Sequence, residues 1–211
     1  MSDWLNIAGK VYVVTGGSSG IGKAIVDELL ESGANVANLD LNENDTKNEH
    51  YLFIKTDVTN HEYVAAAVSE IVAKFGTING LVNNAGINMP RLLVDVKHPG
   101  GEYELSESAF DKIFSINVKG AYIVAQCVSR VMATHDGGVI VNMSSEAGLE
   151  GSEGQSPYAA SNAAIHGFTR SWSKELARHD IRVVGFSPGI MEETDLRTLS
   201  YDESLAYTRG K

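Results

Sequence analysis

The chain has 211 residues, enough for an α/β domain with a large buried core. Its formal net charge of −10 argues against nucleic acid or an anionic membrane as a main partner. No apolar run is long enough to span a bilayer, and the first residues show no basic and apolar leader, so we expect a cytoplasmic protein. Cys127 is the only cysteine and the histidines are dispersed, so we predict no intrachain disulfide and no metal site.

The first structural signal is an apolar, mostly β-branched run at residues 11–15, which predicts a buried strand. It ends in a glycine-rich stretch at 16–22, after which apolar residues recur at helical spacing. A strand, a tight turn and a helix start direct several backbone N–H groups toward one point, where the helix dipole also favours an anion. The stretch therefore predicts a diphosphate site, with an ordinary glycine-rich βα turn as the plainer interpretation.

A second strand is predicted at residues 35–40, and it ends in Asp40. A carboxylate about twenty residues beyond such a glycine turn accepts hydrogen bonds from an adenosine ribose and repels a 2′-phosphate. Neither the glycine turn nor the residues just after Asp40 contain an Arg or Lys. We therefore favour NAD over NADP, with a solvated strand end as the alternative interpretation of Asp40.

The rest of the chain continues this alternation of strands and helices. Further strands are predicted at residues 51–56, 78–83, 139–143 and 182–187, and helices from about residues 60, 106 and 156. Residues 42–49 are predicted to be a short exposed connection, and residues 88–104 a long loop of the kind that often carries function. Repeated βα units imply a parallel sheet with helices on both faces. We therefore predict one doubly wound, Rossmann-type α/β/α domain over residues 1–211.

Helix starts and faces are also visible in the sequence. Thr59 and Glu62 resemble a capping box, Ser106 is a cap for the helix that runs to Met132, and Ser156 before Pro157 is a third cap. The last of these helices carries a stripe at i+4 spacing, which is more typical of core or subunit contact than of a ligand site: Ala160, Ala164, Phe168, Trp172 and Leu176. Cys127 also lies in a helical pattern and is predicted to be a packed thiol.

Several motifs resemble those of the short-chain dehydrogenases/reductases, in the family's order and spacing. The segment Thr15–Gly22 resembles the family's TGxxxGIG turn, and residues 83–86 match its NNAG motif. The family's helix asparagine, serine and tyrosine are matched by Asn117, Ser145 and Tyr158, and its later Pro-Gly by residues 188–189. Each motif alone is weak, but the ordered set is highly specific.

The resemblance implies an NAD-dependent oxidoreductase that interconverts a secondary alcohol and a ketone. It implies that the Tyr158 hydroxyl exchanges a proton with the substrate oxygen, that Ser145 orients this oxygen and that Asn117 holds a water chain. The cofactor-binding residues that it implies are Gly16, Ser18, Ser19, Gly20, Ile21, Gly22, Asp40, Leu41, Asp57, Val58, Asn84, Ala85, Gly86, Tyr158, Asn162, Pro188, Gly189 and Ile190.

One catalytic position departs from the family pattern. The family has a lysine one helical turn after its tyrosine, where it stabilises the phenolate and holds the nicotinamide ribose, and this chain has Asn162. An unperturbed tyrosine has a pKa of about 10, so only about one phenol in a thousand is ionised at neutral pH. Asn162 lies on the tyrosine's helix face but carries no charge. We therefore expect the chain to retain NAD binding even where its catalytic activity is reduced. A catalytically impaired NAD-binding homologue is an alternative function.

The substrate is indicated only by resemblance. Segments 146–154 and 182–192 resemble those of the sorbitol-6-phosphate 2-dehydrogenases within this family, which implies a polyol or ketose of the sorbitol 6-phosphate and fructose 6-phosphate type. A reductase of another carbonyl, such as a keto-acyl thioester, is a further alternative, although no basic run is evident for an acidic carrier. Candidates for a phosphate contact, each with a solvated charge as its plainer interpretation, are Arg91, Lys97, Arg197 and Arg209.

The resemblance also bears on assembly and length. Family members commonly form tetramers through two long helices, here at residues 106–132 and 156–178, and a dimer is the alternative. The family usually continues for several dozen residues and adds a seventh strand. We therefore expect this chain to be C-terminally incomplete, with that strand missing from its sheet and residues 192–211 as the start of a mobile lid.

Overall fold

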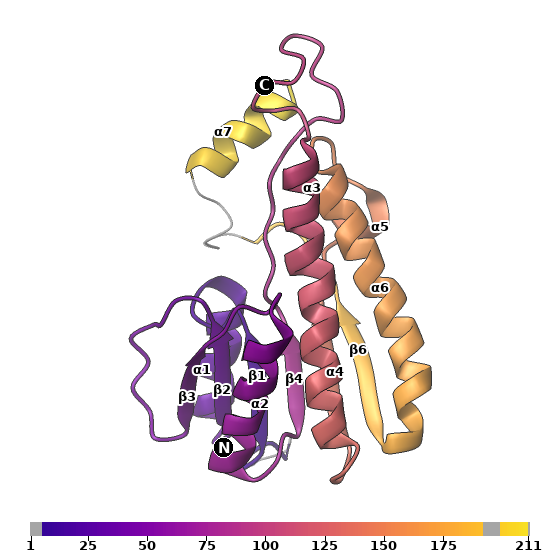
Figure 1. Ribbon diagram of the computed structural model, residues 1–211. Helices are drawn as coiled ribbons and strands as arrows, with labels where there is room; N and C mark the ends of the chain where they lie inside the picture. The colour runs from indigo at the N-terminus through magenta and orange to yellow at the C-terminus, as the bar shows by residue number, and fades with distance from the viewer. Residues whose placement is uncertain (1–5, 192–198, 211) are drawn as a thin grey trace.

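The computed structural model describes residues 6–191 and 199–210, and within them six strands form one parallel sheet. The strands are β1 (Val11–Thr15), β2 (Asn35–Asp40), β3 (Tyr51–Lys55), β4 (Gly80–Asn83), β5 (Gly138–Met143) and β6 (Ile181–Phe186). Their order is β3-β2-β1-β4-β5-β6, so the sheet grows outward from β1 and β4 in both directions (Figure 1). This order confirms the predicted doubly wound, Rossmann-type fold.

Helices cover both faces of this sheet. They are α1 (Gly20–Glu31), α2 (His61–Phe75), α3 (Glu107–Phe114), the π-helix η1 (Ser115–Gly120), α4 (Ala121–Met132), α5 (Ala147–Glu150), α6 (Ser156–Leu176), the 3₁₀ turn η2 (Ala177–His179) and α7 (Leu199–Thr208). None of the helices in the described ranges is both long and apolar enough to cross a membrane.

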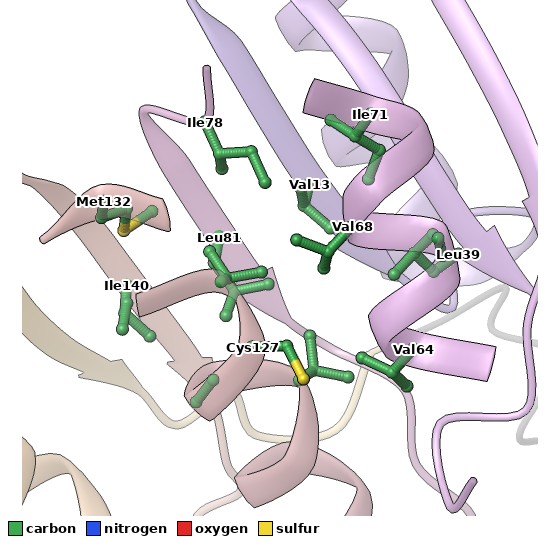
Figure 2. Close-up of a cluster of buried hydrophobic side chains, with 14 of the residues drawn as sticks. Val13, Leu39, Val64, Val68, Ile71, Ile78, Leu81, Cys127, Met132 and Ile140 are labelled. Carbon is green, nitrogen blue, oxygen red and sulfur yellow. The ribbon is translucent and has the colours of Figure 1, made fainter. Parts of the chain in front are cut away.

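Two buried clusters join the layers, one on each face of the sheet. Successive strand side chains point to opposite faces, so Val13 and Leu81 enter the larger cluster whereas Val14 and Val82 enter the smaller one. Figure 2 shows the larger cluster, where α2 and α4 pack over the sheet, and α1 covers the other face. Cys127 lies in the larger cluster, and burial raises the pKa of its thiol, which agrees with the packed role predicted for it.

The capping box predicted at Thr59 and Glu62 is wrong, because the next residue caps α2. Asn60 Oδ1 accepts hydrogen bonds from the backbone N–H groups of Glu62 at 2.9 Å and Tyr63 at 3.2 Å. The Thr59 hydroxyl instead donates to Asp57 Oδ1 at 2.7 Å. Asparagine is at least as good an N-cap as threonine, so the sequence alone does not distinguish Thr59 from Asn60. The hydrogen bond to Asp57 leaves Asn60 as the cap.

The other two predicted caps had different outcomes. Ser106 does cap α3, since its Oγ accepts a hydrogen bond from the Ala109 N–H at 3.2 Å. Ser156 is already the first residue of α6, after Gln155, and no side chain caps that helix. The long helix predicted from 106 to 132 is present, but its middle turn is the π-helix η1.

The predicted stripe on α6 is partly buried. Phe168 and Trp172 stack with ring centroids 4.5 Å apart, and Trp172 and Leu176 pack against the larger cluster. Ala160, in contrast, is exposed. The C-terminal half of the stripe therefore packs on the core, which is one of the two predicted interpretations, the other being subunit contact.

We predict that Ile140→Ala lowers the free energy of unfolding by about 2–5 kcal/mol, because it leaves a cavity in the larger cluster. Ile140 is fully buried on β5 (Figure 2). Urea denaturation measures the loss, with Val184→Ala as control, since Val184 on the neighbouring β6 is 47 % exposed. The control should lose less than about 1 kcal/mol, and equal losses in both variants would contradict the prediction.

Candidate active site

The ends of the parallel strands bring the predicted site residues together. Strands that run in the same direction end at the same edge of the sheet, which is where open α/β sheets bind ligands. The glycine turn follows β1, Asp40 ends β2, and the segments that begin at Asn84, Ser144 and Ser187 follow β4, β5 and β6. Residues far apart in the sequence therefore meet along one line.

A set of hydrogen bonds ties the end of β1 to the end of β4. Thr15 Oγ1 accepts hydrogen bonds from the backbone N–H groups of Asn84 and Ala85, each at 3.0 Å. In return, Asn84 Nδ2 donates to the carbonyl oxygens of Thr15 and Gly16, each at 3.1 Å. The glycine turn is thus held against the polar segment that follows β4.

The glycine turn itself has no room for side chains at Gly16, Gly17 or Gly22. Gly16 has a φ of 65°, and a Cβ there would lie 3.0 Å from Ala85 Cα. A Cβ on Gly22 would collide with the Gly16 carbonyl oxygen, so this glycine lets the first turn of α1 pack against the loop. The result is a turn that presents its backbone to a ligand, which is what close approach of a diphosphate requires.

Buried polar side chains hold the turn from behind. Asn38 on β2 is fully buried, and its Oδ1 accepts a hydrogen bond from the Gly17 N–H at 2.9 Å. Asn38 Nδ2 donates to Ser18 Oγ and to Tyr51 Oη, each at 2.9 Å. Tyr51 Oη donates in turn to Asn44 Oδ1 at 3.1 Å.

The segment 42–49, predicted to be an exposed connection, is therefore partly packed. Asn44 is half-buried, and its Nδ2 donates to the Gly17 carbonyl oxygen at 3.4 Å. Sequence reasoning missed Asn38 and Asn44, and the one available signal was a polar residue inside an otherwise apolar strand. Burial also raises the pKa of the Tyr51 phenol, so its hydroxyl keeps the proton that it donates to Asn44.

Asp40 is oriented by the backbone on both sides. Its Oδ2 accepts a hydrogen bond from the Ser18 N–H at 3.1 Å, and its Oδ1 accepts one from the Asn42 N–H at 3.1 Å. The carboxylate is therefore fixed beside the glycine turn, at the end of β2.

A cavity of about 650 Å³ extends along these strand ends. It is lined by Gly16, Ser19, Gly20, Ile21, Leu39, Asp40, Leu41, Thr56, Asp57, Val58, Thr59, Asn84, Ala85, Gly86, Ile87, Lys112, Ser115 and Ile116. Most of the predicted cofactor-binding residues line it. Ser18 and Gly22 do not, because the Ser18 hydroxyl bonds to the Asn42 carbonyl and Gly22 packs beneath the turn. Sequence reasoning missed Lys112, which α3 brings to the cavity wall.

A second cavity, of about 370 Å³, continues from the first. Four residues line both cavities: Ile21, Asn84, Ala85 and Gly86. The second cavity is also lined by Asn88, Asn117, Met143, Ser144, Ser145, Glu146, Ala147, Glu150, Gly151, Ser152, Gln155, Tyr158, Asn162, Ile165, Pro188, Gly189, Ile190, Met191, Tyr201, Leu205 and Arg209. All four predicted catalytic residues, and Pro188, Gly189 and Ile190, lie in this wall. The described residues contain no group of His, Cys, Asp or Glu side chains suited to a metal ion.

Ser145 and Tyr158 present hydroxyl groups to this second cavity. Ser145 Oγ accepts a hydrogen bond from the Ala147 N–H at 3.2 Å, so its own hydrogen remains available to a ligand. Tyr158 is half-buried at the start of α6, and none of the described residues makes a hydrogen bond to its hydroxyl. Both residues line the same cavity, and neither hydroxyl hydrogen is donated to another of the described residues.

The two asparagines are engaged with the protein. Asn117 Oδ1 accepts from the Ile87 N–H at 2.9 Å, while its Nδ2 donates to the Ile87 carbonyl at 2.9 Å and to Ser161 Oγ at 3.1 Å. Asn162 is buried and its Nδ2 donates to the Tyr158 carbonyl at 2.9 Å. The side chain of Asn162 thus folds back on its own helix.

The comparisons with known proteins agree with this geometry. The sequence profile of the short chain dehydrogenases matches residues 10–204. Sorbitol-6-phosphate 2-dehydrogenase of Klebsiella pneumoniae is 54% identical, over 100% of this chain and 79% of that protein. The 3-oxoacyl-[acyl-carrier-protein] reductase FabG of Thermotoga maritima is 38% identical, over 89% of this chain and 76% of that protein. The chain therefore belongs to the short chain dehydrogenase family and is an oxidoreductase.

Proposed function

We propose that the protein is an NAD-dependent dehydrogenase that interconverts a secondary alcohol and a ketone on a phosphorylated sugar alcohol or ketose. The observation that carries the proposal is the continuity of the two cavities through Ile21 and residues 84–86. A dinucleotide held on the glycine turn would reach from Asp40 to the cavity that contains Ser145 and Tyr158.

The residues of the larger cavity fit such a cofactor. The bare backbone at Gly16 would hold the diphosphate, and Asp40 would accept hydrogen bonds from the adenosine ribose. Residues 188–190 would border the nicotinamide end, because they line the second cavity together with Tyr158. When bound, the cofactor exchanges a hydride with the substrate carbon.

In this reaction Tyr158 Oη exchanges a proton with the substrate oxygen, and Ser145 Oγ donates a hydrogen bond to the same oxygen. Asn117 acts as a positioning residue, because it joins the Ile87 backbone to Ser161 Oγ, which donates to the Tyr158 carbonyl at 2.8 Å. This network would hold α6 in place against the segment that follows β4.

The sugar-phosphate substrate is supported by the 54% identity to the Klebsiella enzyme over the whole chain. A keto-acyl reductase is supported less, by relatives such as the Thermotoga FabG at 38% identity. Assays with sorbitol 6-phosphate and NAD, and with a keto-acyl thioester and NADH or NADPH, separate the two substrates. Turnover of the thioester alone would overturn the proposal.

We also propose that the protein assembles as a homotetramer or homodimer through the outer faces of the two long helical segments, which are α3 to α4 and α6. Of these, α3 and η1 contact α6, and α3 lies beside α6 in Figure 1. Tyr122 on α4 is 42 % exposed, so this helix offers an aromatic side chain, a residue type that is enriched at protein interfaces, to a partner subunit. Light scattering coupled to size-exclusion chromatography should give two or four times the 22.7 kDa of one chain. A monomer at micromolar concentration would contradict this assembly.

Asp40→Ser should shift the cofactor preference toward NADP, because it removes the negative charge that repels a 2′-phosphate. The ratio of the NADPH and NADH dissociation constants, measured by fluorescence titration, should fall about tenfold or more, a change of about 1.4 kcal/mol. Glu43→Ser is the matched control, since it removes an exposed acidic charge three residues away. An unchanged ratio in Asp40→Ser would show that this carboxylate does not select the cofactor.

Asn162→Lys should raise kcat at neutral pH by about ten- to a thousandfold, because a nearby cation stabilises a phenolate at Tyr158. Asn162 lines the second cavity, so the longer side chain has space to extend there. NADH binding should change much less than kcat.

Two further variants control this experiment. Asn162→Gln lengthens the side chain without adding charge and should not raise kcat, and Tyr158→Phe in the lysine background should abolish the gain. An equal kcat in the original chain and a folded, NADH-binding Asn162→Lys variant would sink the idea that the asparagine limits catalysis.

A further inference from the structure

The second cavity is closed on one side by α7. Tyr201, Leu205 and Arg209 are spaced four residues apart, so they lie on one side of α7 and the turn that ends it, and all three line the cavity. The Arg209 N–H donates to the Leu205 carbonyl at 3.1 Å, which continues the helical turn to this residue. The position of Arg209 in the cavity wall therefore depends on how α7 is held.

Two contacts of Tyr207 hold α7 against the loop that joins β4 to α3. Figure 1 shows α7 beside this loop. The Tyr207 hydroxyl donates to Asp95 Oδ2 at 2.7 Å, and the Tyr207 ring stacks on Tyr103 with centroids 4.1 Å apart. This hydrogen bond raises the pKa of Tyr207 to about 12 and lowers the pKa of Asp95. Both groups therefore keep the protonation states that the bond requires at neutral pH.

A second contact holds the same end of α7, at the residue next to Tyr207. A Cβ on Gly154 would collide with Thr208 Oγ1, so α7 sits directly on this glycine. The Gly154 carbonyl accepts a hydrogen bond from the Arg91 N–H at 2.7 Å, which joins this segment to the same loop. The last turn of α7 is thus fixed between two segments, and Arg209 with it.

Arg209 has the chemistry of an anion site. Its Nη2 donates to Ser152 Oγ at 3.2 Å, and within the described residues no carboxylate lies within ion-pair distance of it. A guanidinium has five N–H donors in a fork that suits a phosphate, so most of its donors remain for a ligand. Because Ser152 Oγ accepts here, its own hydrogen can point to the same anion.

The charges around the second cavity favour binding of a phosphate at the end that contains Arg209. Among the described residues that line it, Arg209 is the one with a positive charge, whereas Glu146 and Glu150 bring carboxylates to the wall formed around α5. A phosphate would be repelled near those carboxylates. Its favourable position is therefore beside Arg209.

The other basic residues considered from the sequence are less suited. The Arg91 guanidinium lies over the Tyr103 ring, 5.8 Å from its centroid, and donates to the Pro90 carbonyl. Lys97 is exposed and does not line the cavity. Arg197 lies outside the described residues.

We propose that Arg209, together with Ser152, binds the phosphate of the substrate and thereby selects a phosphorylated sugar alcohol over the free one. This inference rests on the proposed function, because it names the part of the same site that recognises the phosphate. The cavity of about 370 Å³ has the size of a small-molecule site.

The test measures binding, so that slow turnover does not obscure it. Sorbitol 6-phosphate is titrated calorimetrically into the NADH complex, where it cannot react, and inorganic phosphate is titrated in parallel. Arg209→Ala should weaken the binding of both about ten- to a hundredfold, the range for losing a hydrogen bond to a charged group. Arg209→Lys keeps the positive charge but loses the fork of N–H donors. Its affinity for both ligands should therefore lie between that of the original chain and that of Arg209→Ala.

Lys97→Ala is the matched control, since it removes an exposed cation from the loop that contacts α7, and it should bind both ligands as the original chain does. Melting temperatures and NADH affinity show whether each variant is folded. Equal binding of sorbitol 6-phosphate by the original chain and folded Arg209→Ala would overturn the proposal.

The phosphate titration separates failure of this inference from failure of the proposed function. If inorganic phosphate binds through Arg209 but sorbitol 6-phosphate does not bind, the anion site stands and the sugar-phosphate substrate is wrong. If the original chain binds neither ligand, the anion site itself is wrong.

Discussion

The exchange of hydrogen bonds between Thr15 and Asn84 is the constraint on which both halves of the site depend. The Thr15 hydroxyl receives two backbone N–H groups from the segment after β4, and Asn84 returns its amide to two carbonyls at the start of the glycine turn. Loops at strand ends are ordinarily the most variable part of such a sheet. Here the two loops are fixed relative to each other by hydrogen bonds. The residues that the two cavities share, Ile21 and 84–86, therefore keep their positions relative to the glycine turn.

The parts of the fold that the sequence predicted well are those set by local pattern. Apolar, mostly β-branched runs defined β1 and β5, and the glycines between β1 and α1 marked a backbone with no room for side chains. Asp40 could be singled out by its distance from the glycine turn, whereas Ser145 and Tyr158 could be singled out only through the family resemblance. Parallel pairing then brings them together without further information, since strand ends must meet at one edge.

The parts that could not be predicted depend on partners that are distant in sequence. Asn38 is an ordinary polar residue until the fold places it behind Gly17, 21 positions earlier. Lys112 reaches the larger cavity only because α3 passes over it, and the contact between Tyr207 and Asp95 spans 112 positions. The choice between Thr59 and Asn60 as a cap failed for a different reason, because two adjacent side chains were of similar quality and a neighbouring carboxylate took one of them.

The π-helical turn at Ser115–Gly120 has a consequence for how this chain can change in length. A π turn contains one more residue than an α turn, and it lies between α3, which borders the larger cavity, and α4, which enters the core. Because each residue of a π turn rotates the chain by less than the about 100° of an α-helical residue, the wide turn absorbs its extra residue, and deleting one residue here would restore regular α geometry with α4 still facing the core. The change would be local, because the π turn carries Asn117, whose hydrogen bonds to Ile87 and Ser161 would have to be rearranged. A one-residue difference in length at this turn would therefore affect the second cavity, which Asn117 lines, more than the packing of α4 in the core.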